Sequence, residues 1–472
     1  MTTFYVQPFV LPYIPTDSED MDWSISNLNL EEEGHGVPCE TPASTPAPDL
    51  DVHFDKNTPI PVIAEHFRST GDYAKKGGKL FEYQDGKYVV GEDSVNLRMT
   101  YLLGNAWTSN KVESVKKYLL AKAEYLEDKP DPNLINVLNG IYDLSEQKLL
   151  PHTPKLLTTI QLPVVYDSTK GCPNIDKFIN EVFPADAVTF AFEWIGYLLT
   201  ADSTMHVALL LVGDGRNGKS TFLKLCQYIL GKDNYTSVPI NLTKAFQLAI
   251  MYGKLANISS DLPPKRVLDT DILKQMIAGD SVHAEYKNKD GFTYEPFIRF
   301  MFACNEIPAS DDRSDGFKER FKVVPFSNSF ITNPDPYLLS KLTTPGELSG
   351  LLNKALEAWS KAKAIGAFSK SVALDKGKQL FAEAIDHVQI FLSENTISGD
   401  DFKAVKKDLF LVYQNWCKNV NFSKPYTRNN FNKQIVKKYR QVHDGKTNKD
   451  YWKGIGLLAS AEQELLYEEH SK

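Results

Sequence analysis

The chain has 472 residues, of which 42% are hydrophobic and 24% charged, so it is long enough for roughly two to four domains with cores of their own. Its net charge is −7, and its five cysteines lie far apart without a CxxC pair, which favours neither a zinc site nor a disulfide framework. No apolar run is long enough to cross a bilayer and no basic-then-apolar leader is present, so we expect a cytoplasmic protein without membrane contact.

The N-terminal segment differs from the rest in charge. Residues 1–51 contain ten carboxylates and no lysine or arginine, which leaves the remaining chain with a net charge of +3. The run PCETPASTPAPD has too little apolar surface to offset the entropy of ordering, which predicts a disordered acidic tail over residues 1–52. The alternative is that FYVQPFVLPYIP, at the start of this tail, docks onto a replication partner. We favour the solvated tail.

Further regions follow the tail. Residues 53–168 mix short helical and strand patterns separated by turn signals such as Asn139-Gly140, which predicts an N-terminal α+β domain. Residues 169–345 alternate apolar strands with helices, as a parallel α/β layer does. A lysine-rich helical connection is expected over residues 346–375, and a small basic domain over residues 376–472.

The stretch LLLVGDGRNGKST, residues 209–221, matches the pattern GxxxxGK[ST] between an apolar run and a predicted helix. In this pattern, glycine N–H groups and the helix N-terminus surround phosphate oxygens. We therefore expect Lys219 to reach the β- and γ-phosphates of ATP and Ser220 to bind Mg²⁺. The predicted nucleotide-binding residues are Gly213, Asp214, Gly215, Arg216, Asn217, Gly218, Lys219, Ser220 and Thr221. The alternative is a glycine-rich turn with an exposed lysine.

A second apolar strand, KLANISSDLP, is predicted to end at Asp261. A carboxylate at this place would bind Mg²⁺ or orient the attacking water. Its alternative is a helix-capping or turn aspartate.

The runs VHAEYK and FTYEPF come next, joined by Asn288-Lys289-Asp290-Gly291. Asp-Gly between two alternating runs is a strong hairpin signal. It predicts a hairpin with Lys287 and Lys289 at its tip, where the phosphate backbone of a nucleic acid is the natural target.

Two polar residues follow in the same layer. Asn305 ends the apolar run PFIRFMFACNEIP, where its amide would hold the lytic water, although a turn residue before Pro308 is the alternative. Arg320 precedes another apolar strand and suits an arginine that reaches the nucleotide of a neighbouring subunit. An ordinary surface arginine is its alternative, and Arg299 and Arg313 are nearby competitors for the role.

The basic C-terminal region has a recognisable pattern. Residues 401–455 hold thirteen lysines and arginines against four acids. A helix is expected after Thr427 as cap, with Arg428 and Lys433 near its leading end, followed by a β-ribbon that turns at Asp444-Gly445. A helix followed by a ribbon is a winged-helix pattern, which predicts duplex DNA binding. The alternative is a basic helix that only packs against the rest of the molecule.

The order of the glycine-rich loop, NISSDLP, GDSVHAEYKNKDGF, FACNEIP and GFKERF resembles superfamily 3 helicases, specifically the phage, plasmid and poxvirus-type primase-helicases. The resemblance covers roughly residues 55–460. It implies an AAA+-type P-loop ATPase, usually a hexameric ring, that translocates on single-stranded DNA and unwinds the replication fork of a mobile element in a bacterial host. By position it assigns the nucleotide to Lys219 and Ser220, the second-motif acid to Asp261, a central-channel contact to Lys289, the sensor to Asn305 and the finger in trans to Arg320.

Two departures from the family pattern matter. Ser260 precedes Asp261 where many relatives have paired acids, so the resemblance leaves open whether Asp261 is a metal ligand, a catalytic base or both. Larger members also carry an N-terminal primase for which this chain has no room, so primase activity is not expected.

A different function class stays open. The chain would then be a DNA-binding initiator or remodelling ATPase without processive unwinding. A small-molecule P-loop kinase would account for neither the hairpin nor the basic C-terminal region.

Overall fold

The computed structural model describes residues 52–239, 245–260, 262, 270–287, 290–308, 310, 312, 314–330, 332, 334–420 and 425–459. The predicted tail up to residue 51, and Asp261, Lys289 and Arg313, lie outside these residues. No helix in the described part of the chain combines the length and apolar character that crossing a membrane requires.

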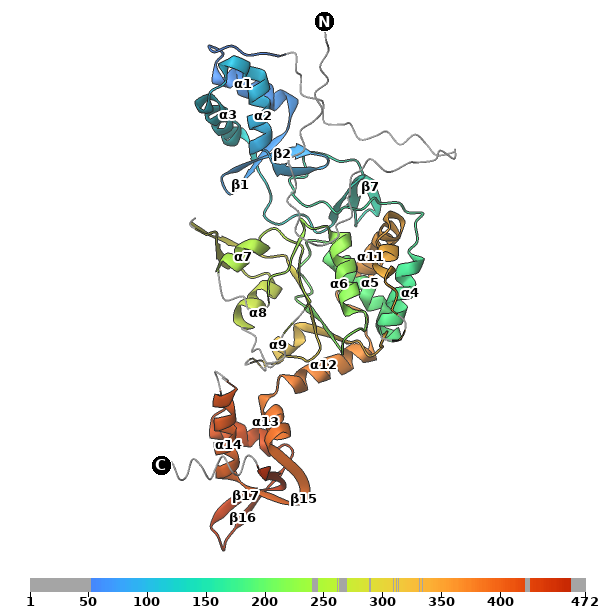
Figure 1. Cartoon of the computed structure of the whole chain (residues 1–472), viewed down its shortest axis with the longest axis vertical. Helices are drawn as coiled ribbons and strands as arrows, with labels where there is room; N and C mark the ends of the chain where they lie inside the picture. Colours follow the sequence, from blue (N-terminus) through green and yellow to red (C-terminus); the bar gives the residue numbers. More distant parts are fainter. Residues whose placement is uncertain are drawn as a thin grey trace. The chain divides into compact units, whose positions relative to one another are not determined.

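The first described elements form a small α+β unit (Figure 1). Its elements are α1 (Ile60–Thr70), β1 (Tyr73–Lys76), β2 (Lys79–Gln84), β3 (Lys87–Val90), α2 (Glu92–Leu103), a short 3-10 turn at Gly104–Ala106, α3 (Ser109–Lys122) and β4 (Glu124–Tyr125). The strands form one sheet in the order β3-β2-β1-β4. Phe67 of α1, Met99 of α2 and Val115 of α3 are buried together against Leu80 of β2, which makes a core separate from the layer that follows.

A second small sheet consists of β5 (Leu134–Val137), β6 (Gly140–Asp143) and β7 (Lys148–Leu150). Its inward side chains Ile135, Val137 and Tyr142 join the hydrophobic cluster of the following α/β layer. The predicted boundary after residue 168 therefore does not separate two cores, because turn signals mark loops and not the core on which a strand packs.

The central layer contains a five-stranded sheet. Its strands are β8 (Ala208–Val212), β9 (Tyr235–Thr236), β10 (Ala256–Ser259), β13 (Arg299–Cys304) and β14 (Phe321–Pro325), in the order β14-β8-β13-β10-β9. All neighbouring pairs are parallel, which confirms the predicted parallel α/β layer.

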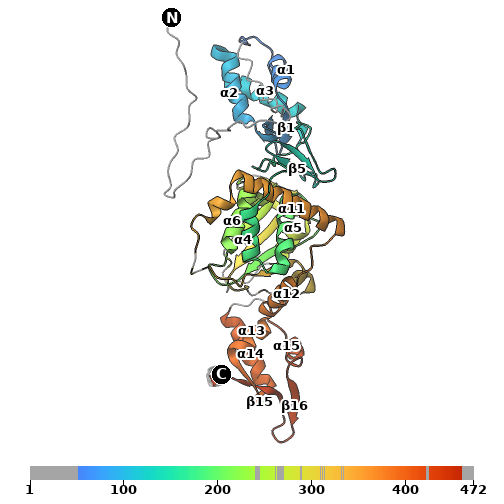
Figure 2. The same cartoon turned by 90° about the vertical axis from the view of Figure 1, so that its right-hand side faces the viewer.

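Helices cover both faces of this sheet, as burial of a parallel sheet requires. Leu209 and Leu211 of β8 lie in one cluster, while Ala208 and Leu210 lie in the other, because successive strand residues point to opposite faces. The first face carries α4 (Pro173–Val182), α5 (Val188–Leu198), α6 (Lys219–Leu230) and α11 (Pro345–Ile365), with the short helices η3 (Ala185–Ala187) and α10 (Leu338–Leu342) (Figure 2). The second face carries α7 (Ala245–Met251), α8 (Thr270–Ala278), α9 (Asp315–Glu319) and α12 (Val372–Ala384).

Helix α12 corrects the predicted boundary at residue 376, which falls inside it. A side chain at Gly377 would meet the carbonyl oxygen of Val323 at 2.0 Å, so the helix lies directly on β14. Phe381 stacks on Phe321 at 4.8 Å between ring centroids, and Ile385 is fully buried in the same cluster. The composition changes near residue 376 because the chain becomes more basic there, and not because its packing changes. We propose that the C-terminal unit begins after Ile385.

The C-terminal unit has its own hydrophobic cluster, which starts at Val388. Its elements are α13 (His387–Asn395), β15 (Thr396–Val405), α14 (Lys406–Asn419), α15 (Arg428–Ile435), β16 (Arg440–Asp444) and β17 (Lys449–Leu457). The strands form an antiparallel sheet in the order β15-β17-β16.

Candidate nucleotide-binding site

The glycine-rich loop, residues 213–218, joins the carboxyl end of β8 to α6. Gly218 is the residue before α6 and has φ +90°, where a side chain would also lie 2.5 Å from a methyl carbon of Val182. Glycine is therefore required at this position. The predicted strand, loop and helix are confirmed, and the first turn of α6 offers N–H groups without intrahelical partners, which suit an anion.

Lys219 is buried against this loop, with 7% of its surface exposed. Its Nζ donates to the carbonyl oxygens of Gly213 and Asp214, the latter at 3.2 Å, and to Oδ1 of Asn217 at 3.0 Å. Burial lowers the pKa of Lys219, and the charge of nearby Asp214 opposes this effect. The ammonium group thus lies inside the loop, where it would meet a bound phosphate.

Asn305 lies beside the same loop. The N–H of Gly213 donates to the carbonyl oxygen of Cys304 at 3.3 Å, and Asn305 follows β13 directly and is exposed. Burial raises the pKa of the Cys304 thiol to about 12, so this neighbour stays neutral. The sheet order brings the carboxyl end of β13 between those of β8 and β10. Lys219 and Asn305 are therefore brought together at one edge.

The second predicted acid, Asp261, lies outside the described residues. Strand β10 ends at Ser259, and the N–H of Leu262 donates to the carbonyl oxygen of Ala303 near the end of β13. Among the described residues there is no group of three or more metal-binding side chains. The magnesium site at Ser220 and Asp261 stays a prediction, and Ser220 is exposed on the first turn of α6.

Arg320 lies at the opposite edge of the sheet. Its carbonyl oxygen accepts from the N–H of Ala208, the first residue of β8, whereas the loop follows the last residue of that strand. The five residues of β8 span about 16 Å at roughly 3.3 Å per residue. Nη1 of Arg320 donates to the carbonyl oxygen of Gly316 at 2.7 Å. The structure therefore does not bring Arg320 to the loop of its own chain.

Arg299, a competitor for the same role, is 1% exposed in the core. Its Nη2 donates to the carbonyl oxygen of Thr200 at 2.8 Å, and its guanidinium lies 4.3 Å from the ring centroid of Tyr197. A side chain buried in this way cannot reach a neighbouring subunit, so Arg299 is eliminated as a candidate.

The predicted hairpin is confirmed as β11 (Val282–Glu285) paired antiparallel with β12 (Gly291–Tyr294). Val282 and Ala284 are buried, whereas the side chains at 283, 285 and 287 are exposed. Tyr286 stacks on Phe292 at 5.3 Å between centroids, so the base of the turn is held by aromatic packing. Lys287 is exposed beyond β11, and Lys289 lies outside the described residues.

The predicted helix in the C-terminal unit is confirmed as α15, with Thr427 as its cap. Arg428 and Lys433 are exposed, while Phe431 and Ile435 on the opposite side of the helix are buried. The predicted ribbon is confirmed as β16 and β17, joined by residues 445–448. The cationic side chains of α15 are thus free to contact a partner, and DNA binding stays a prediction.

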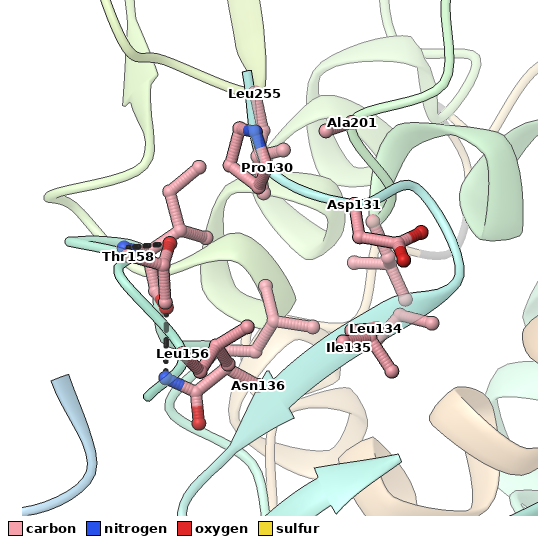
Figure 3. A pocket seen from close by; sticks show the side chains of 12 residues that line it. Pro130, Asp131, Leu134, Ile135, Asn136, Leu156, Thr158, Ala201 and Leu255 are labelled. Carbon is pink, nitrogen blue, oxygen red and sulfur yellow. Dashed lines mark hydrogen bonds between the residues drawn. The ribbon is translucent and has the colours of Figure 1, made fainter. Parts of the chain in front are cut away.

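A pocket lies away from the loop (Figure 3). It is lined mainly by apolar side chains of β5, of the segment 156–162 and of the central layer, including Leu134, Leu199 and Leu255. Asn136, which also lines it, uses its Nδ2 to donate to the carbonyl oxygens of Gly86 and Ile160, both at 2.9 Å. These bonds tie chain segments together, and none of the loop residues lines this pocket.

Sequence reasoning missed the partners of Asn217 and the aromatic stack of the hairpin, and no sequence signal pointed to the former. Nδ2 of Asn217 donates to the carbonyl oxygen of Phe326, which lies 109 positions further along the chain. The alternation of VHAEYK and FTYEPF indicated strands, and aromatic residues at facing ends, Tyr286 and Phe292, were the available hint of cross-strand stacking.

Two family models match parts of the chain. Residues 62–184 match the family described as D5 N terminal like, and residues 211–320 match a family of unknown function, DUF5906. The second match begins within β8 and ends at Arg320, so it spans the loop, the hairpin and Asn305.

Three viral proteins named putative helicases are similar to the chain. Putative helicase L207/L206 of Acanthamoeba polyphaga mimivirus is 24% identical over 216 residues, which are 43% of this chain and 22% of that protein. Putative helicase 184R of Invertebrate iridescent virus 6 is 26% identical over 243 residues, 46% of this chain and 24% of that protein. Putative helicase 121R of Invertebrate iridescent virus 3 is 21% identical over 366 residues, 68% of this chain and 39% of that protein. The matches thus span between about a fifth and two fifths of the length of these relatives.

Two solved structures of the apo C-terminal region of NrS-1 are also similar to the chain. One has 15% identity and a TM-score of 0.43 and covers 72% of this chain and 76% of its own. The other has 13% identity and a TM-score of 0.45 and covers 82% of this chain and 96% of its own. By sequence, residues 62–184 resemble the D5 N terminal like family, and up to 68% of the chain is similar to viral proteins named putative helicases.

Proposed function

We propose that this chain is the motor part of an ATP-dependent replicative DNA helicase of a mobile genetic element. The observation that carries the proposal is the placement of the candidate nucleotide residues at two edges of a single sheet. Lys219 and Asn305 lie at the carboxyl edge, and Arg320 lies at the opposite edge. The names of the viral relatives and the match to the D5 N terminal like family also support a helicase function.

In this proposal ATP binds across the loop and the first turn of α6. The glycine backbone, the buried ammonium of Lys219 and the unpaired N–H groups of the helix form a surface that fits phosphate oxygens. Ser220 and Asp261 would hold Mg²⁺, which neutralises charge on the transferred phosphoryl group. Asn305 would hold the attacking water.

Arg320 would complete this site in a neighbouring copy of the chain. It lies too far from its own loop to stabilise charge there, and it directly precedes β14, the strand that pairs with β8. A set of copies that each donate one arginine to the next closes into a ring, and a hexamer is the proposed form.

DNA would be contacted at two places. The hairpin that carries Lys287 and Lys289 would grip the backbone of a single strand, and the exposed Arg428 and Lys433 of α15 would bind duplex. The hairpin continues through β12 into β13, which ends beside Asn305, so a change at the loop can be passed to the strand contact.

The test is a paired assay of ATP turnover and of strand displacement from a forked duplex. The proposal expects turnover that single-stranded DNA stimulates, together with displacement. Stimulated turnover without displacement would favour the second candidate, an initiator or remodelling ATPase, which the exposed cations of α15 also support. Absence of any turnover would contradict both candidates.

A further inference from the structure

Lys219 already has a full set of hydrogen-bond partners in the loop. A lysine ammonium has three N–H donors, and here it contacts the carbonyl oxygens of Gly213 and Asp214 and the side-chain oxygen of Asn217. Any phosphate that binds Lys219 has to replace some of these contacts. The loop oxygens and a nucleotide therefore compete for the same ammonium group.

Asn217 is the side chain among these three partners. It is 3% exposed, and its amide is used at both ends, because Oδ1 accepts from Lys219 and Nδ2 donates to the carbonyl oxygen of Phe326 at 3.1 Å. A donor on one side and an acceptor on the other fix the orientation of the amide. Asn217 therefore connects the ammonium group directly to the backbone that follows β14.

Residues 326–330 are bonded to the loop at further points. The N–H of Phe326 donates to the carbonyl oxygen of Val212 at 2.7 Å, and the N–H of Phe330 donates to that of Arg216 at 3.0 Å. A side chain at Gly213 would meet the carbonyl oxygen of Phe326 at 2.2 Å and Nδ2 of Asn217 at 2.5 Å. Because of this close packing, a change in the conformation of the loop requires residues 326–330 to move as well.

We propose that Asn217 is a positioning residue that holds Lys219 against the loop's own oxygens and passes the displacement of Lys219 by a nucleotide to residues 326–330. The inference rests on the proposed nucleotide function of the loop. When Lys219 turns to phosphate oxygens, Oδ1 of Asn217 loses its donor. A buried amide oxygen without a donor is unfavourable, so Asn217 and the Phe326 carbonyl that it contacts rearrange together. These residues follow β14, the strand that begins after Arg320.

Two substitutions of Asn217 separate this role from a merely structural one. Asn217→Asp keeps the size and the acceptor for Lys219, but it loses the donor to the Phe326 carbonyl oxygen and places a carboxylate beside Lys219. ATP then has to replace an ion pair and approach a like charge. We expect its dissociation constant for a fluorescent ATP analogue with Mg²⁺ to rise at least tenfold. Asn217→Ala removes one competitor for the ammonium, so the same constant is expected to fall severalfold. Opposite signs are the signature, because simple damage to the loop would weaken binding in both variants.

Hydrogen exchange supplies a second readout on the full-length chain. Addition of the ATP analogue is expected to change exchange in a peptide that covers residues 326–330 of the wild type, and to leave this peptide unchanged in Asn217→Ala. Equal changes in both proteins would overturn the coupling, even if the affinities behave as expected.

Asn328→Asp is the matched control. This variant adds the same negative charge, but at a position within residues 326–330. Asn328 itself is exposed, and its Nδ2 donates to the carbonyl oxygen of Glu181 at 2.5 Å and not to the loop. Its ATP affinity should stay within about twofold of the wild type, and an equal loss in Asn328→Asp and Asn217→Asp would show a general charge effect and overturn the inference. A wild type that binds no ATP would instead contradict the proposed function, whereas weaker binding in both Asn217 variants would contradict this inference alone.

Discussion

The two edges of the central sheet differ in whether the candidate residues of a single chain come together there. At the carboxyl edge, Lys219 has three oxygen partners and Asn305 lies beside the loop through the bond between Gly213 and Cys304. At the opposite edge, Arg320 donates to the carbonyl oxygen of Gly316, four residues earlier, and lies a full strand length from the loop. The carboxyl edge thus brings candidate residues of one chain together, whereas Arg320 lies away from them and its proposed role requires a second copy.

The largest expected effect comes from breaking the carboxyl edge. Lys219→Ala should abolish ATP turnover and strand displacement, because it removes the cation that we propose to meet the β- and γ-phosphates. The measurement is steady-state phosphate release, with circular dichroism to verify that the chain is folded. Lys224→Ala, an exposed lysine on the same helix, should keep normal turnover. Near-normal turnover in Lys219→Ala would contradict the assignment of the loop.

The next effect tests the helix that supports the opposite edge. A chain that ends at residue 376 loses Phe381 and Ile385 from the core under β14, and removal of buried side chains of this size costs about 2–5 kcal/mol each. Because domains are stable by only about 5–15 kcal/mol, this chain should unfold at a much lower temperature. A chain that ends at residue 386 should keep the melting temperature and basal turnover of the full chain.

The same pair of truncations locates the C-terminal unit. The chain that ends at 386 should lose most of its duplex affinity and show a flatter dependence of that affinity on salt, because several phosphate contacts are removed together. Equal melting temperatures for the two truncations would show that α12 is not part of the central layer. An unchanged salt dependence would leave the C-terminal unit as packing alone.

A smaller effect is expected from breaking the opposite edge itself. Arg320→Ala should lower turnover by about 10³, as the removal of an arginine that stabilises the transition state does. Mixing Arg320→Ala with Lys219→Ala should restore part of the activity, because some interfaces then pair an intact loop with an intact arginine. Lys318→Ala, in the short helix α9 that precedes Arg320, is the control and should have little effect, since Lys318 pairs with Asp315. No rescue in any mixture would mean that Arg320 does not act between copies.

The comparison of the edges also shows what the sequence could predict. The pattern from 213 to 220, the Asp-Gly signal at 290–291 and Thr427 before α15 each place their information within a few residues. The loop before α6, the pairing of β11 with β12 and the capped helix α15 that they predict are confirmed. Turn and cap chemistry act over short distances, so a single sequence is enough to identify them. The chemical roles of Lys219, Asn305 and Arg320 stay predictions.

Contacts between distant segments could not be predicted in the same way. The bond between Asn217 and Phe326 joins positions 109 residues apart, and the burial of Arg299 depends on Tyr197 of α5 and on Thr200, which follows that helix. The predicted boundaries assigned the sheet β5-β6-β7 to the N-terminal domain and most of α12 to the C-terminal domain, but both pack on the central layer. The apolar face of an element does not indicate which core it covers. Composition predicted the domain boundaries from changes in charge, whereas the structure divides the chain according to which hydrophobic core each element joins.

The smallest expected effect concerns the hairpin, which is the proposed contact with single-stranded DNA. It follows α8 and continues through β12 into β13, so it is connected to the carboxyl edge. The double variant Lys287→Ala, Lys289→Ala should keep basal turnover and lose stimulation by single-stranded DNA. The slope of the logarithm of single-strand affinity against that of salt should become shallower by about 1.4, at roughly 0.7 for each lost phosphate contact. The control is Lys177→Ala, Lys361→Ala, which removes two exposed lysines of α4 and α11 whose partners are Glu181 and Glu357. Fork displacement is then measured with both double variants. Normal displacement by the hairpin variant would mean that the hairpin is structural, and that the carboxyl edge passes its change to DNA through another contact.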